Sequence, residues 1–247
     1  ATGHEIYAPF ELVGMDMASS APWNFGAFSV TSLGLASGAD FVRAIWHGLS
    51  ELVEDDAFFA PMTGRRGAPM QESLLLSRQH QTLVGVLDSL AQNDVEARFV
   101  DLTDDITVPT VAAALCPANK NCTELAYFSG RSCRPTLEDA ALAALLEAAQ
   151  TRLTFISGSR DDLLAAEYTR PLKGGTRELF GAYALADRAI EPFDVTKALY
   201  ELVGKVLALG VDVYVFPLGG SNMGIEVVRV LADDLLSMEG PVDQARS

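Results

Sequence analysis

The hydrophobic and polar positions of this chain follow two different periods, one typical of helices and the other typical of strands. Apolar residues that recur every three or four positions predict amphipathic helices. The helices predicted in this way span residues 40–56, 71–91, 136–156 and 194–209. Thr136 is a residue type that caps helix N-termini, and Gly210 is the type that follows helix C-termini.

Short runs rich in β-branched and aromatic residues predict strands between these helices. They span residues 27–33, 95–102, 108–115, 211–216 and 225–230. Because helices and strands are mixed along the whole chain, we predict an α/β (α+β mixed) fold with mixed sheets flanked by long amphipathic helices. No internal repeat or linker interrupts the pattern, so residues 1–247 are predicted to form a single domain. The least regular stretches, 60–69, 118–134 and 168–176, are predicted loops.

The first long helix carries a polar stripe opposite a broad apolar face. The stripe consists of Arg43, His47, Glu51, Glu54 and Asp55. Glu51 and Glu54 are three positions apart, which places their Cβ atoms about 5–6 Å from each other on a helix. Two adjacent carboxylates repel unless a cation lies between them, and Mg²⁺ prefers one or two carboxylates together with phosphate oxygens. The stripe is therefore compatible with a magnesium site, but from the helix alone an ordinary solvent-exposed face is the favoured interpretation.

The helix predicted over residues 136–156 has a similar design. Its predicted apolar face comprises Leu142, Leu145, Leu146, Ala149, Leu153 and Ile156. Its predicted polar face comprises Glu147, Gln150, Thr151 and Thr154. Arg152 lies near the edge of the apolar arc, so we expect a carboxylate or a phosphate as its partner. A structural ion pair and a ligand-binding role are both compatible with this position.

The composition narrows the classes of partner. The net charge is −15, from 33 acidic and 18 basic residues, which disfavours nucleic acids and anionic membranes. No apolar run reaches the length of about 18 residues that a membrane-spanning helix needs, and residues 1–4 do not resemble a signal peptide. Three cysteines without a paired spacing argue against a disulfide framework. A cytoplasmic location is the expectation.

Five segments resemble, in their order along the chain, the motifs of the YcaO-like family, over about residues 5–236. They are Glu5-Ile-Tyr-Ala-Pro-Phe-Glu-Leu-Val13, Ser32-Leu-Gly-Leu-Ala-Ser-Gly38, His47-Gly-Leu-Ser-Glu-Leu-Val-Glu-Asp-Asp-Ala57, Glu147-Ala-Ala-Gln-Thr-Arg152 and Gly158-Ser-Arg-Asp-Asp162. The resemblance implies an enzyme that uses ATP and Mg²⁺ to activate a backbone amide of a ribosomally made peptide. In such a reaction the amide oxygen attacks the γ-phosphate of ATP, a nucleophile adds to the amide carbon, and phosphate leaves. The product would be an azoline, as in a cyclodehydratase, or a thioamide.

The resemblance also implies roles for particular residues. Glu51 and Glu54 would bind the metal, and they would hold the nucleotide together with Glu147 and Gln150. Arg152 or Arg160 would neutralise phosphate charge.

Several positions depart from the family pattern. Ala39, Arg43 and Asp55 replace a frequent Asn, Glu and Arg around the first carboxylate pair, and Ala143 and Arg134 replace a frequent Arg and His. Arg43 would be able to neutralise Glu51 in place of a metal. No segment resembles the earlier family block with a serine and two glutamates. Either this chain is a piece of a longer protein, or a second protein subunit supplies this block in a dimer or hetero-oligomer, or the protein does not bind ATP. The alternative is a degenerate, non-catalytic scaffold or peptide-binding subunit paired with an active partner.

Overall fold

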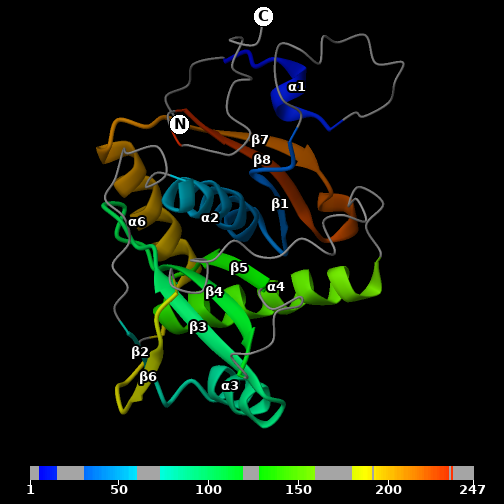
Figure 1. Ribbon diagram of the computed structural model, residues 1–247. Helices are drawn as coiled ribbons and strands as arrows, with labels where there is room; N and C mark the ends of the chain where they lie inside the picture. Colours follow the sequence, from blue (N-terminus) through cyan, green and yellow to red (C-terminus); the bar gives the residue numbers. More distant parts are fainter. Residues whose placement is uncertain are drawn as a thin grey trace, which may run out of the picture. The chain divides into compact units, whose positions relative to one another are not determined.

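The computed structural model in Figure 1 describes residues 6–15, 31–59, 73–118, 128–158, 180–190, 192–233 and 235. These residues belong to two compact units, each of which is described by itself. The first unit comprises Ala1–Ala60 and Val195–Ser247, and the second comprises Pro61–Asp194. The organisation of residues 1–247 as a single domain stays a prediction.

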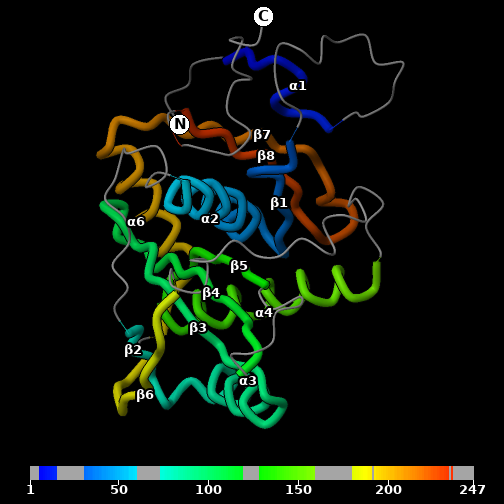
Figure 2. The backbone as a smooth tube through the Cα atoms, in the orientation of Figure 1, coloured from blue at the N-terminus to red at the C-terminus, as the bar shows by residue number. Residues whose placement is uncertain are grey.

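The first unit contains a three-stranded antiparallel sheet with two long helices. Its strands, in sheet order, are β1 (Leu35–Gly38), β8 (Glu226–Ala232) and β7 (Val213–Gly219). Its helices are α1 (Phe10–Val13), α2 (Phe41–Phe59), α6 (Val195–Ala208) and the short η3 (Ser221–Met223). Figure 2 shows the blue β1 beside the red β8, and the register pairs Leu35 with Arg229. Segments from the two ends of the sequence therefore build one sheet, against which α2 packs.

Arg229 of β8 is buried and ties three segments of this unit together. Its Nε donates to the Leu12 carbonyl at 2.9 Å, and its Nη1 donates to the Thr31 carbonyl at 2.7 Å. A buried guanidinium is tolerated because carbonyl oxygens replace the water that it loses. Arg229 therefore anchors the segment of α1 and the entry to β1 on the sheet.

The second unit contains a larger antiparallel sheet and a pair of parallel strands. The antiparallel sheet runs β3 (Val95–Asp101), β4 (Thr110–Pro117) and β5 (Phe128–Cys133). The parallel pair is β2 (Leu74–Ser77) with β6 (Tyr183–Ala186), and the helices are α3 (Gln81–Gln92) and α4 (Leu137–Ser157). Thr136 caps α4, because its hydroxyl accepts a hydrogen bond from the Asp139 amide at 3.1 Å.

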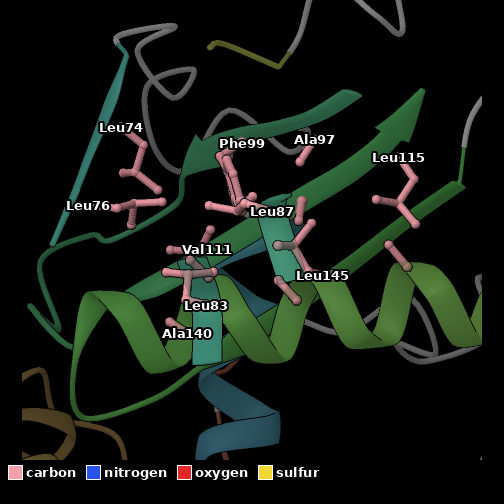
Figure 3. Packing of buried hydrophobic residues seen from close by; sticks show 14 residues of the cluster. Leu74, Leu76, Leu83, Leu87, Ala97, Phe99, Val111, Leu115, Ala140 and Leu145 are labelled. Atoms are coloured by element: carbon pink, nitrogen blue, oxygen red, sulfur yellow. The ribbon is translucent and has the colours of Figure 1, made fainter. Parts of the chain in front are cut away.

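The core of the second unit lies between the β3–β4–β5 sheet and the two helices (Figure 3). Leu76, Leu83, Phe99, Val111 and Leu145 are almost completely buried in it. Each such side chain stabilises the fold by about 1.5–3 kcal/mol through the hydrophobic effect. The part of this core that α4 contributes consists mainly of alanines, which allows α4 to approach the sheet closely.

The predicted fold class is confirmed, since helices and several sheets are mixed along the chain. The three helices predicted over residues 40–56, 136–156 and 194–209 are α2, α4 and α6, with ends that differ by up to three residues. Among the helices that the structure describes, none is long and apolar enough to cross a membrane.

Three predicted elements need correction. The helix predicted over residues 71–91 is the strand β2 followed by α3, because the run of three leucines pairs with β6 more than a hundred residues later. A short apolar run fits a helix or a buried strand equally well by its period. Residues 31–33 of the strand predicted over 27–33 are not a strand, and the rest of that segment lies outside the described residues, as do 60–69 and 168–176. The stretch 118–134, predicted as a loop, contains β5.

Candidate functional site

The N-terminus of α2 is fixed by Asp40 and Arg43. Asp40 Oδ1 accepts a hydrogen bond from the Arg43 amide at 2.8 Å, and the Arg43 guanidinium forms an ion pair with the same carboxylate. The amide hydrogen bond, followed by the guanidinium, lowers the pKa of Asp40 below its ordinary value. Arg43 therefore pairs with Asp40 and not with Glu51, so the idea that it neutralises Glu51 is wrong.

Glu51 is half-buried on α2 and is oriented by a backbone amide. Its Oε2 accepts a hydrogen bond from the Gly34 amide at 2.9 Å. Gly34 has φ of +79°, and a Cβ at this position would lie 2.3 Å from the Val230 carbonyl oxygen. Only glycine fits such a conformation and such a contact. The turn before β1 thus holds one carboxylate oxygen of Glu51, and Glu54 is half-buried one helical turn further along.

His47 lies one turn before Glu51 and has a defined orientation. Its Nδ1 is 3.2 Å from the Ser37 carbonyl oxygen. Because a carbonyl only accepts, this hydrogen bond requires a proton on Nδ1 and directs Nε2 away from the Ser37 carbonyl. Sequence reasoning placed His47 on the polar stripe but gave it no role, although its spacing of four residues from Glu51 was a usable signal.

Asp55 does not belong to the exposed stripe of α2. It is 5% exposed, and the neighbouring Asp56 is 2% exposed. The prediction of a solvated Asp55 was wrong because α2 packs against α6 as well as against the sheet, which narrows its exposed arc. The carboxylates of α2 that remain accessible are those of Glu51 and Glu54.

Glu147 on α4 has the same kind of hydrogen bond as Glu51 on α2. Its Oε2 accepts a hydrogen bond from the Arg131 amide of β5 at 2.9 Å. The adjacent Gly130 permits this contact, since a Cβ there would lie 2.5 Å from both the Ala144 carbonyl oxygen and the Ala148 amide nitrogen. Close approach of helix and strand therefore places the Glu147 carboxylate at the strand backbone.

Gln150 and Arg152 are exposed on α4. Arg152 forms no hydrogen bond or ion pair with the part of the chain that the structure describes, so the expected carboxylate partner is not found there. Arg160 lies outside the described residues. The structure thus groups Glu51 and Glu54 on one helix, and Glu147, Gln150 and Arg152 on another.

The buried face of α4 differs from the predicted one. The residues that it buries are Glu138, Ala140, Ala141, Ala144, Leu145 and Ala148. Leu146, Leu153 and Ile156, predicted to face the core, are more than half exposed. The buried face of α4 carries small side chains because Gly130 brings β5 against the α4 backbone, and a leucine side chain would not fit between them.

The Glu51 and Glu54 pair offers few carboxylates, and such a pair suits a metal ion that also binds the oxygens of a ligand. Among the described residues, no group of three or more His, Cys, Asp or Glu side chains could hold a metal ion. Mg²⁺ does not require such a group, because it is commonly bound by one or two carboxylates plus phosphate oxygens and water. The Glu51 and Glu54 pair fits this kind of hard, oxygen-only donor set.

Two solved structures of heterocyclases share the fold of this chain. A heterocyclase in complex with substrate and cofactor matches 84% of this chain and 28% of its own, with a TM-score of 0.67 and 20% identity. The heterocyclase TruD matches 95% of this chain and 33% of its own, with a TM-score of 0.65 and 17% identity. At such identities the likeness concerns the fold, which is that of the heterocyclases.

The family follows from the match of a family model. The YcaO cyclodehydratase model, described as ATP- and Mg²⁺-binding, matches residues 1–236, and the chain belongs to this family. YcaO from Methanopyrus kandleri, solved with AMPPCP and Mg²⁺, is 25% identical with a TM-score of 0.57, over 85% of this chain and 56% of its own.

Relatives that match this chain in sequence are longer than it is. An uncharacterized protein in the tfuA 3′ region of Rhizobium leguminosarum bv. trifolii is 28% identical over 248 residues, which is 95% of this chain and 58% of that protein. An uncharacterized protein of Methanothermobacter thermautotrophicus is 38% identical over 144 residues, which is 58% of this chain and 37% of that protein. The chain thus spans between about a third and three fifths of these relatives.

Proposed function

We propose that this chain takes part in ATP- and Mg²⁺-dependent activation of a peptide backbone amide, as a cyclodehydratase or thioamide-forming enzyme acting in a complex. Membership of the YcaO family over residues 1–236 supports the cyclodehydratase class. The observation that carries the proposal for this chain is the oriented carboxylate of Glu51, with Glu54 beside it on α2. A cytoplasmic location and a peptide made on the ribosome are further parts of the proposal.

The residues of α2 would hold the metal side of the site. The Gly34 amide holds one oxygen of the Glu51 carboxylate, so this side chain would need little reordering on binding. Glu54, three positions later, would be the second carboxylate. When bound, Mg²⁺ would offset the charge of the ATP phosphates during attack by the amide oxygen.

The residues of α4 would contribute to binding ATP. Glu147 is oriented by the Arg131 amide in the way that Glu51 is oriented by Gly34. Gln150 would donate or accept hydrogen bonds to the nucleotide, and either Arg152 or Arg160 would neutralise phosphate charge. With ATP as phosphoryl donor, the protein's own task is positioning and charge neutralisation.

A second polypeptide is part of the proposal. The McbBCD microcin synthetase has been solved with its pro-peptide bound, and at 14% identity it shares the fold with this chain. We propose that this chain likewise binds a peptide substrate and assembles as a dimer or hetero-oligomer.

A non-catalytic scaffold is the second candidate. Arg43 stands where the family has a carboxylate, and its ion pair with Asp40 places a positive charge near the start of α2. Such a change fits a subunit that presents a peptide to an active partner and no longer binds nucleotide itself.

The two candidates differ in whether Mg-ATP binds. Isothermal titration of Mg-ATP into the chain, alone and mixed with the polypeptide encoded beside it, measures this directly. The catalytic proposal expects binding in at least one of the two titrations. It also expects Glu54→Gln to weaken that binding by about tenfold or more, because a ligand carboxylate has lost its charge.

Glu201→Gln is the matched control for this titration. Glu201 is an exposed glutamate on α6 that pairs with Lys197 at 3.7 Å, a kind of ion pair that contributes little. Its loss should leave Mg-ATP affinity unchanged. Absence of binding in both titrations would exclude the catalytic proposal and favour the scaffold.

A further inference from the structure

The polar side chains that α2 leaves at least partly exposed lie on one narrow face. They are Arg43, His47, Glu51 and Glu54. At about 100° per residue they fall within an arc of roughly 80°, and Ser50 and Asp55, which border this arc, are buried. Arg43 is paired with Asp40. His47 is therefore the residue of this face to which neither the local ion pair nor the proposed function gives a role.

The strand β1 and the turn before it orient two of these side chains. The Ser37 carbonyl oxygen of β1 is 3.2 Å from His47 Nδ1, and the Gly34 amide donates to the Glu51 carboxylate at 2.9 Å. Strand and helix are in close contact here, since a Cβ at Gly38 would lie 2.5 Å from a backbone nitrogen of α2. The imidazole and the carboxylate thus have defined orientations in the protein without a ligand.

The hydrogen bond of His47 is the kind that metal-binding histidines make. Such histidines bind the metal through one ring nitrogen and donate the N–H of the other to a carbonyl or a carboxylate, which fixes the tautomer and the orientation of the ring. In His47 the Ser37 carbonyl is the acceptor, and Nε2 is directed away from it. In the neutral imidazole, Nε2 then carries the lone pair that a metal ion binds.

His47 and Glu51 are spaced so that they can share one metal ion. They are four positions apart on α2, which places their Cβ atoms about 5–6 Å from each other. Side chains on a helix lean toward its N-terminus, so the Glu51 carboxylate leans over the turn that carries His47. Ligand pairs four positions apart on one helix face are also how metalloprotease helices hold their metal.

From this geometry we infer that His47 Nε2 and a Glu51 carboxylate oxygen together bind a divalent first-row transition metal ion, of the kind between Co²⁺ and Zn²⁺. Imidazole suits these ions, whereas Mg²⁺ prefers oxygen ligands. Two protein ligands leave the other positions to water or phosphate oxygens, and no group of three or more potential ligands is present among the described residues. The imidazole thus extends the metal range of α2 beyond Mg²⁺.

The inference shares Glu51 with the proposed nucleotide function but does not depend on that function. Transition-metal binding is measured without nucleotide, and Mg-ATP binding is measured without a transition metal, so either proposal can fail alone. Glu51→Gln should weaken both kinds of binding. His47→Gln should weaken only the binding of the transition metal, because Mg²⁺ makes little use of imidazole.

Calorimetric titration of Co²⁺ into the intact chain measures the affinity. We expect saturable binding, weakened by about tenfold or more in His47→Gln and in Glu51→Gln, because each variant removes a ligand. A roughly hundredfold excess of Mg²⁺ should leave most of the Co²⁺ bound. Glu201→Gln, on the exposed face of α6, is the control and should leave the affinity unchanged. Circular dichroism confirms that each variant retains its helix content.

Histidine-selective ¹⁵N NMR of the unsubstituted chain identifies the ligand without any substitution. Co²⁺ is paramagnetic, so it should shift and broaden the imidazole signals of His47 at the lowest Co²⁺ concentrations. His80 should respond least, because its ring nitrogens contact the Leu83 amide and the Asp139 carboxylate. Absence of saturable Co²⁺ binding would overturn the inference. Unchanged Co²⁺ affinity of His47→Gln, or signal changes confined to the other histidines, would overturn it as well.

Discussion

In each of the two units a backbone amide donates a hydrogen bond to a glutamate on a long helix. The units differ in whether the glycine at the helix–sheet contact lies on the helix or on the strand. In the first unit Glu51 of α2 accepts from the Gly34 amide, and in the second Glu147 of α4 accepts from the Arg131 amide, both at 2.9 Å. Glycine allows close helix–sheet contact in each unit. It lies on the helix in the first unit, as Gly48, and on the strand in the second, as Gly130.

The location of the glycine determines which side chains the helix buries. With Gly48 on the helix, α2 still buries the large side chains Trp46, Leu49 and Leu52 beside it. With Gly130 on the strand, α4 presents mainly alanines to the sheet, and its exposed large apolar residues are Leu146, Leu153 and Ile156. The same hydrogen-bonded placement of a carboxylate is thus accompanied on α4 by three large apolar side chains that are more than half exposed.

The largest expected effect is a difference in the free energy of unfolding between variants of the two neighbours Leu145 and Leu146 on α4. Leu145 is 1% exposed, so Leu145→Ala should lower the free energy of unfolding by about 2–5 kcal/mol through lost contacts and a cavity. Leu146→Ala should change it by no more than about 0.5 kcal/mol, because the side chain is mostly in water. Urea unfolding followed by circular dichroism measures both. Similar losses of stability for the two variants would mean that the Leu146 side chain is buried in solution.

The next effect tests the glycine on the strand against the glycine on the helix. Gly130→Ala forces a Cβ against helix backbone and should cost about 1–3 kcal/mol. Gly48→Ala should cost less, because a Cβ there would meet the Val230 Cγ2 atom at 2.7 Å and one backbone atom, the Gly34 carbonyl oxygen, at 2.9 Å, whereas a Cβ at Gly130 would meet two backbone atoms at 2.5 Å. Gly204→Ala on α6 meets nothing within 4 Å and should stabilise the helix by about 0.5–1 kcal/mol. A greater loss of stability for Gly48→Ala than for Gly130→Ala would contradict this comparison of the two units.

A smaller effect tests the shared hydrogen bond. Glu147→Gln and Glu51→Gln remove the charge from the acceptor, and each should lower stability by about 0.5–1.5 kcal/mol. Hydrogen exchange by NMR should speed up at the Arg131 amide in the first variant and at the Gly34 amide in the second. Exchange rates that change at neither amide would show that these hydrogen bonds do not position the carboxylates.

The smallest effect concerns the start of α2, which a titratable residue caps, whereas threonine caps α4. Folding lowers the pKa of Asp40, so its contribution to stability is present above the unfolded pKa of about 3.9 and is lost as pH falls through the folded value. Asp40→Asn keeps a capping side chain but removes the charge. Stability measured between neutral and acidic pH should then fall less steeply below about pH 4. Parallel curves for the two proteins would contradict the assignment.

The sequence by itself determined the elements whose signals are local. The period of the apolar residues located α2, α4 and α6, and Thr136 marked the start of α4, because caps and periodicity depend on neighbours within one or two turns. The order of the motifs gave the family, and the spacing of Glu51 and Glu54 gave their common place on one helix.

Only the tertiary structure decided features that depend on distant partners. β2 is a strand because β6 pairs with it, and the turn at Gly34 orients Glu51 across a separation of 17 residues. Which face α4 buries was decided by Gly130, because alanine and leucine both satisfy a hydrophobic pattern while only alanine fits against a strand backbone at that distance. Hydrophobic periodicity records that a helix has apolar faces, and the room available in the packed structure selects the one that is buried.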